Sequence, residues 1–143
     1  MLVEQVSVFI ENKQGRLFAI SDVLAKNDID ISALSLAENS EYGVIRMIVN
    51  NPHKAKEVLN DGGVICKVSP VLAVAIDDVP GGFSKAIKLL TDNDIEIKYM
   101  YACVSHEKGK ALMIFSTNDN QKAEDIICKQ KGQDIKPNDI YRI

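Results

Sequence analysis

The stretch ENKQGRLFAISDVLAKNDIDI (residues 11–31) is matched 66 positions later by DDVPGGFSKAIKLLTDNDIEI (residues 77–97). At this offset, 12 of 43 aligned pairs (residues 6–48 of the first copy) are identical. With a two-residue insertion after them, KAKEVL (residues 54–59) aligns with KAEDII (residues 122–127). This repetition indicates a tandem duplication, in which one structural unit is encoded twice.

Composition excludes several classes of protein. The 143 residues are 46% hydrophobic, enough to bury a core in one domain or in two small ones. The formal charge of -3 offers no basic surface for nucleic acid. The three cysteines are widely spaced and odd in number, which is typical of free thiols in a reducing compartment. The longest apolar run, VLAVAI (residues 71–76), is too short to span a bilayer, and the start of the sequence lacks a basic signal-peptide region. We therefore expect a cytoplasmic, globular protein without a membrane anchor.

Both copies have the same pattern of predicted elements. In the first, apolar residues alternate in the strands and recur at helical spacing in the helices. The first helix follows a loop with Gly15 and is predicted to stop at Asn27 in a left-handed conformation, as its twin stops at Asn93. The predicted order is strand 3–11, helix 16–27, strand 28–38, strand 44–50, helix 52–61 and strand 62–68. The second copy should end in a weaker strand within residues 132–143, which contain Pro137.

The order β-α-β-β-α-β defines an α+β, ferredoxin-like module. We expect two such modules in tandem, residues 1–68 and 69–143. Only KVSP (residues 67–70) lies between them, too short for independent movement, so the modules should pack together. Many unrelated functions share this fold, so the function must be argued from a site.

The sequence gives little support for catalysis. His53 and His106 have no second histidine at metal-ligand spacing, and no serine lies in a G-x-S-x-G motif. The phosphate-binding patterns G-x-x-x-x-G-K-[ST] and G-x-G-x-x-G are also missing. We therefore expect a non-enzyme with no catalytic residue, no metal and no cofactor.

The two glycine loops are the best candidates for binding. Each opens a predicted helix, whose first N–H groups have no partner within the helix and point toward the loop. A small carboxylate fits such a place, and Asn12 offers both a donor and an acceptor for a zwitterion. A turn that simply requires Gly15 and Gly81 would explain the same pattern.

These loops also carry a family resemblance. ENKQGRL (residues 11–17) and VPGGF (residues 79–83) resemble the [D/N]-x-P-G-x-L signature of the ACT domain, the regulatory amino-acid-binding module of biosynthetic enzymes. The resemblance covers nearly the whole chain, twice, and free-standing tandem ACT proteins of this size are the most similar. The first copy resembles the serine-sensing ACT domain of phosphoglycerate dehydrogenase. On that match Asn12 is the ligand-binding Asn, Gly15 the loop glycine, and Asp30 the second-strand residue that reaches the ligand across the interface.

The chain also departs from the family pattern. Gln14 replaces the usual proline, and Asp30 and Glu96 replace asparagine. Asp78 stands where Asn12 stands in the first copy, and an anionic Asp78 would repel a ligand carboxylate. The resemblance therefore implies two unequal sites, of which the first loop is the better candidate.

The family also implies a geometry. ACT modules commonly pair side by side through their second strands, which gives one antiparallel eight-stranded sheet with helices on one face. Amino acids then bind in the groove between modules, here between residues 12–18 and 99–104 and, reciprocally, between residues 78–84 and 33–37. Tyr99 and Tyr101 are expected either to cover the core or to select the ligand side chain. The predicted ligand-binding residues are Asn12, Gln14, Gly15, Arg16, Leu17, Phe18, Asp30, Asp78, Gly81, Gly82, Phe83, Glu96, Met100 and Tyr101.

Three functional hypotheses follow. The first is an amino-acid sensor, a homodimer that modulates a metabolic enzyme; the resemblance implies an acyl-CoA ligase or an amino-acid biosynthetic enzyme as partner. The second is a small enzyme similar to acylphosphatase, with Arg16 in the first loop, although the loop pattern and a suitable Asn are missing. The third is a protein-interaction subunit, similar to the small subunit of acetolactate synthase, whose ligand site is weak or vestigial.

Overall fold

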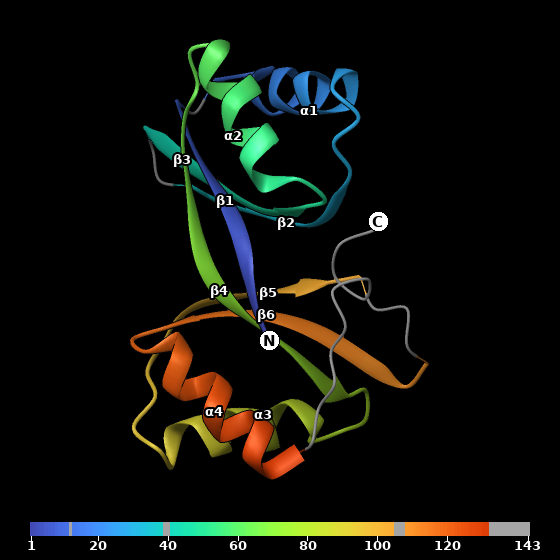
Figure 1. The fold of residues 1–143 in the computed structure, drawn as a ribbon, viewed down its shortest axis with the longest axis vertical. Helices are drawn as coiled ribbons and strands as arrows, with labels where there is room; N and C mark the ends of the chain where they lie inside the picture. Colours follow the sequence, from blue (N-terminus) through green and yellow to red (C-terminus); the bar gives the residue numbers. More distant parts are fainter. Residues whose placement is uncertain (12, 39–40, 105–107, 132–143) are drawn as a thin grey trace. The chain divides into compact units, whose positions relative to one another are not determined.

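The computed structural model describes residues 1–11, 13–38, 41–104 and 108–131. They form two compact units. Of the described residues, the first module comprises Glu4–Ser69, and the second comprises Met1–Val3 together with those between Pro70 and Lys131. Figure 1 shows two helices in each module, α1 and α2 in the first and α3 and α4 in the second. In the described part of the chain, no helix has the length and apolarity needed to cross a membrane.

The elements of the first module follow the predicted order. They are β1 (Leu2–Glu11), α1 (Arg16–Lys26), β2 (Ile31–Glu38), β3 (Tyr42–Val49), α2 (Pro52–Asp61) and the start of β4 (Ile65–Asp77). The second module contains the rest of β4, then α3 (Gly82–Thr91), β5 (Ile97–Cys103), β6 (Lys110–Thr117) and α4 (Asn120–Lys131). Helix α2 begins and ends at the predicted residues. Pro52 is its first residue, and the Asn51 side chain caps this end by accepting a hydrogen bond from the Lys54 N–H at 3.0 Å.

The prediction of eight strands is wrong. The described residues form six strands in the order β2-β3-β1-β4-β6-β5, because the last strand of the first copy and the first strand of the second are one continuous strand, β4. Residues 67–70 therefore lie within a strand and are no linker. The strand expected within residues 132–143 lies outside the described residues. Pairing of the modules through their second strands is also wrong, because β2 and β5 are at opposite ends of the strand order.

The first residues of the chain belong to the second module. The Ala73 N–H donates to the Met1 carbonyl at 2.8 Å, and the Leu2 N–H donates to Glu124 Oε1 at 2.9 Å. Val3 is buried. This segment lies beside β4, in the place that the fourth strand of a β-α-β-β-α-β unit would occupy.

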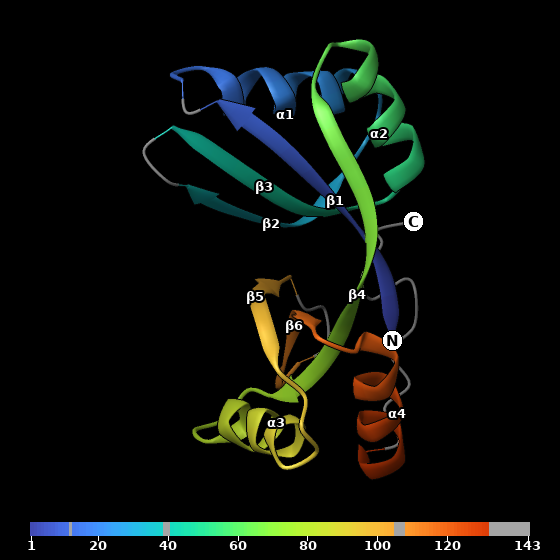
Figure 2. The ribbon, with the colours of Figure 1, turned by 90° about the vertical axis from the view of Figure 1, so that its left-hand side faces the viewer.

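Each module buries its own core between the helices and one face of the strands. In the first module, Val6 and Val8 alternate on the inner face of β1 and pack with Ile20 and Leu24 of α1. Figure 2 shows α1 and α2 on the same side of β1, β2 and β3. The core of the second module has the same arrangement. The residues at the equivalent positions are Leu72, Val74, Ala86 and Leu90.

The structure moves the predicted helix stop by one residue. Asn27 has φ −108°, whereas Asp28 has φ 56° and is the left-handed residue. The Asn27 side chain instead donates to the Val23 carbonyl at 2.8 Å, which satisfies the last turn of α1. The second copy repeats the arrangement, with Asp94 at φ 59°. An aspartate takes the strained position in both copies because a short polar side chain tolerates it.

The structure places the two-residue insertion between the copies earlier in the chain than the sequence alignment does. Val6 pairs with Met47 in the first module, and the equivalent Leu72 pairs with Phe115 in the second. The offset is therefore 66 residues in the first strand but already 68 in the third, so the two extra residues lie between Cys103 and Lys110. The four sequence identities counted between residues 41 and 48 consequently align residues that are not structurally equivalent.

Candidate functional site

The glycine loop of the first module presents unpaired backbone donors. Gly15 has φ 85°, a conformation that glycine adopts without strain, and α1 begins directly after it. The Arg16 N–H donates to the Lys13 carbonyl at 3.3 Å, and the Ala19 N–H donates to the Gly15 carbonyl at 3.0 Å. Among the described residues, the N–H groups of Leu17 and Phe18 have no acceptor. Of the donors that were predicted to be unpaired, the Arg16 N–H is therefore bonded within the loop, whereas the Leu17 N–H lies at the positive end of the α1 dipole without a described acceptor.

The second loop has the same backbone trace but is packed more tightly. Gly81 has φ 83°, and the Gly82 N–H donates to the Val79 carbonyl at 2.9 Å. Gly82 is buried, and a Cβ on it would overlap the Asp77 carbonyl oxygen. Its counterpart in the first copy is Arg16, whose side chain is about half exposed. The two loops are thus not interchangeable, because only the first accepts a side chain at this position.

The predicted site residues of the first loop are mostly at the surface. Gln14, Arg16, Leu17 and Phe18 are exposed, and the Phe18 side chain retains 74% of its accessible surface. Asn12 lies outside the described residues. In the second loop, Asp78 and Phe83 are exposed.

The structure does not bring Asp30 to the loop of its own module. Gly15 precedes α1 and Asp30 follows it, so the 11-residue helix, about 16 Å long, separates them. The Asp30 backbone is bonded to Asn50, because the Asn50 N–H donates to the Asp30 carbonyl at 3.1 Å. Glu96 and Asn118 repeat that contact at 3.0 Å. Asp30 and Glu96 are therefore fixed just before β2 and β5, and their contact with a ligand across the interface stays a prediction.

Met100 and Tyr101 are part of the packing of the second module. Met100 packs against the core cluster and pairs with Phe115, whereas Tyr101 is 8% exposed and pairs with Ile114 on the other face of the sheet. Tyr99 shares the face of Tyr101, as the alternation predicts.

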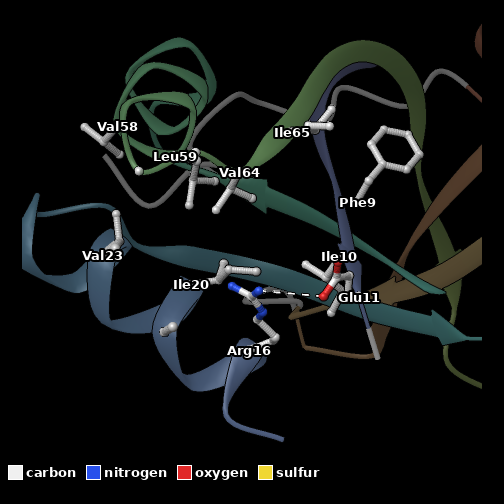
Figure 3. A pocket seen from close by; sticks show the side chains of 13 residues that line it. Phe9, Ile10, Glu11, Arg16, Ile20, Val23, Val58, Leu59, Val64 and Ile65 are labelled. Carbon is white, nitrogen blue, oxygen red and sulfur yellow. Dashed lines mark ion pairs between the residues drawn. The ribbon is translucent and has the colours of Figure 1, made fainter. Parts of the chain in front are cut away.

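Sequence reasoning missed a pocket inside the first module. Its volume is about 310 Å³, and it lies between α1, the end of α2 and the neighbouring ends of β1 and β4 (Figure 3). Residues far apart in the sequence meet there, so no single motif predicts it. The only local signals are the pair Gly62–Gly63 and the cation at position 16. The lining residues are Phe9, Ile10, Glu11, Arg16, Ala19, Ile20, Val23, Val58, Leu59, Gly62, Gly63, Val64 and Ile65.

Charged groups lie at one side of this pocket. Lys13 Nζ is 2.5 Å from Glu11 Oε2, and Arg16 Nη2 is 3.9 Å from the same oxygen. The hydrogen bond and the charge of Lys13 lower the pKa of Glu11 below its ordinary value. Glu11 is therefore ionised at neutral pH, with Lys13 as its nearer counter-ion.

The described residues show no metal-binding cluster. Across the described ranges, no group of three or more His, Cys, Asp or Glu side chains is placed to hold an ion. His53 Nε2 lies 3.2 Å from Glu4 Oε2 and is 74% exposed. His106 lies outside the described residues.

Comparison with known proteins identifies the family. A model described as an ACT domain pair matches residues 1–143. The chain belongs to the ACT domain family. Its fold is the regulatory fold of that family, shared with regulatory subunits of aspartate kinase.

Solved structures resemble this ACT pair over nearly its whole length. Protein BT0572 from Bacteroides thetaiotaomicron is 33% identical, with a TM-score of 0.90, and the match covers 100% of this chain and 98% of that one. The ligand-free regulatory subunit of aspartate kinase from Thermus thermophilus is 14% identical, with a TM-score of 0.67 and coverages of 90% and 96%. The Thermus flavus subunit is 13% identical, with a TM-score of 0.61 and coverages of 90% and 94%. The last two likenesses concern the fold alone. No curated protein gave a match.

Proposed function

We propose that this ACT pair is a non-catalytic regulator that binds a small amino acid at the glycine loop of its first module. The observation that supports it most is that the N–H groups of Leu17 and Phe18, behind a left-handed Gly15, have no acceptor among the described residues. Two adjacent amides at a helix N-terminus suit a carboxylate. An Asn12 side chain would complete the recognition of the ammonium group.

The first loop is the better candidate of the two. It carries Asn12 where the second carries the anionic Asp78, which would repel a carboxylate. Its Arg16 adds a positive charge at the position where the second loop has the packed Gly82. A single ligand per chain is therefore the expected stoichiometry.

The regulated partner would be a metabolic enzyme. The two Thermus structures are described as regulatory subunits of aspartate kinase, and we propose a comparable role here, with an amino-acid biosynthetic enzyme or an acyl-CoA ligase as target. The ligand transmits a signal only if it binds one state of the complex more tightly than the other.

We also propose that the chain forms a homodimer through β2. Among the described residues, β2 is an end strand of the sheet, and Leu34 and Leu36 on it remain 42% and 45% exposed. An open edge with apolar side chains is a template for pairing with another chain. This exposed edge also favours the second candidate, a protein-interaction subunit whose ligand site is vestigial.

A thermal-shift panel of the twenty amino acids tests the proposal. A ligand at 100 times its Kd stabilises the native state by about 2.7 kcal/mol, a shift of several degrees. We expect one amino acid to raise the Tm, Asn12→Ala to abolish the shift, and Asp78→Ala in the second loop to leave it intact. If no amino acid shifts the Tm but the chain binds an enzyme, the interaction subunit replaces the sensor. Hydrolysis of an acyl phosphate would contradict both.

A further inference from the structure

We propose that the pocket inside the first module binds a small aliphatic monocarboxylate, with the hydrocarbon tail in the pocket and the carboxylate on Arg16. This site shares Arg16 with the proposed amino-acid site but does not use the amides of Leu17 and Phe18. It does not depend on the amino-acid sensor proposed above.

The pocket has the size and the walls of a site for a short hydrocarbon chain. Its volume of about 310 Å³ lies at the lower end of the range for small-molecule sites. Val23, Val58 and Val64 pack against the core but stay half-buried, because the pocket separates α1 from the end of α2. A tail between them would remove this apolar surface from water. At the rim, a Cβ on Gly63 would meet no atom within 4 Å, so the entrance is open.

The charge at the pocket favours an anion. Arg16 Nη2 is 3.9 Å from Glu11 Oε2, which is longer than a hydrogen bond, and no described residue accepts one from the guanidinium. Glu11 is held more closely by Lys13, at 2.5 Å. Two cations and one anion therefore lie at the pocket, which leaves one positive charge. Figure 3 shows Arg16 and Glu11 there, and the planar donors of Arg16 match the two oxygens of a carboxylate. An ammonium group would be repelled by Arg16 and would have to compete with Lys13 for Glu11.

The second copy shows that this cation is not required by the fold. Gly82 occupies the position of Arg16, and a side chain there would overlap the Asp77 carbonyl. Lys85 stands at the position of Ala19, which lines the pocket in the first copy. The combination of a small residue at 19 with an arginine at 16 is therefore a feature of the first module alone.

Methyl NMR of the full chain, titrated with butanoate, pentanoate and hexanoate at pH 7, tests the inference. We expect the methyl signals of Val23, Val58 and Val64 to shift, with roughly fourfold tighter binding for each added methylene. Hexylamine, which has the same tail and the opposite charge, should bind at least about tenfold more weakly than hexanoate. Leucine provides a third comparison, because its side chain is similar but it carries an ammonium. Unmoved methyl signals, or equal binding of hexylamine or leucine, would overturn the assignment.

Matched variants on α1 test the roles of the charge and of the space. Arg16→Gln should weaken hexanoate binding about tenfold. Lys26→Gln removes one positive charge from the other end of α1 and should leave the binding unchanged. Ala19→Phe should block the pocket, whereas Ala25→Phe, also exposed on α1, should not. An Arg16→Gln variant with unaltered affinity would refute the role of the guanidinium. A thermal shift by an amino acid that survives Ala19→Phe would leave the sensor standing while hexanoate binding is lost, so the two proposals fail separately.

Discussion

Replacing Gly82 by alanine should destabilise the second module, although alanine is ordinarily favoured over glycine in a helix. The added methyl group would overlap the Asp77 carbonyl oxygen, and no flexible side chain can move to relieve a contact with the backbone. Overpacking of this kind typically costs 1–3 kcal/mol, so we expect a loss of about 2 kcal/mol. For a chain of 143 residues this corresponds to a fall in Tm of roughly 6 °C.

The control is Gly62→Ala, which follows α2 in the first module. Its Cβ would lie 3.4 Å from the Leu59 carbonyl oxygen, an ordinary contact, so a change within about 0.5 kcal/mol is expected. Chemical denaturation followed by circular dichroism gives both values. If Gly82→Ala is as mild as Gly62→Ala, the second loop is not held against Asp77, and the argument that the two loops differ fails.

Three further changes have outcomes that follow from single contacts. Asn51→Ala removes the side-chain acceptor at the start of α2 and should cost about 1 kcal/mol in urea denaturation. Burial raises the pKa of the Cys66 thiol, so at pH 8 it should react with a disulfide reagent more slowly than the exposed Cys128; equal rates would contradict this. Because the pKa of Glu11 is lowered in the folded state, its contribution to stability is present above pH 4.5 and is lost as the pH falls through the folded-state pKa. The Lys13→Ala variant should raise this pKa toward 4.5, which NMR of the carboxyl group measures.

Local patterns were sufficient to predict the module. Periodicity located the strands and helices, and Pro52 at the helix entry fixed the start of α2, because both signals depend on neighbouring residues only. The glycine loops were found for the same reason, since Gly15 and Gly81 each precede a helix at an equal offset.

Features that depend on distant partners were not predictable in this way. Residues 67–70 were predicted to lie between the copies, yet Pro70 lies within β4, where its carbonyl accepts from Asn120 Nδ2 at 2.9 Å. The two-residue insertion between the copies could be placed only from the pairing of β1 with β3 and of β4 with β6. The sequence alignment had placed it too late, because four identities in this region occur at the wrong offset. The pocket was missed because its walls come from four separate elements.

The duplicated sequence repeat and the folded module do not have the same boundaries. Met1 and Leu2 precede the first repeat, but they bond to Ala73 and Glu124 of the second module. A gene cut between Ser69 and Pro70 would yield two complete repeats but not two complete modules, because the second fragment lacks the strand segment that the other end of the chain supplies. Recombination that exchanges one repeat for a homologue must therefore exchange three distant residues as well. Such a chain evolves most readily as a whole pair, and chimaeras designed at the repeat boundary inherit this constraint.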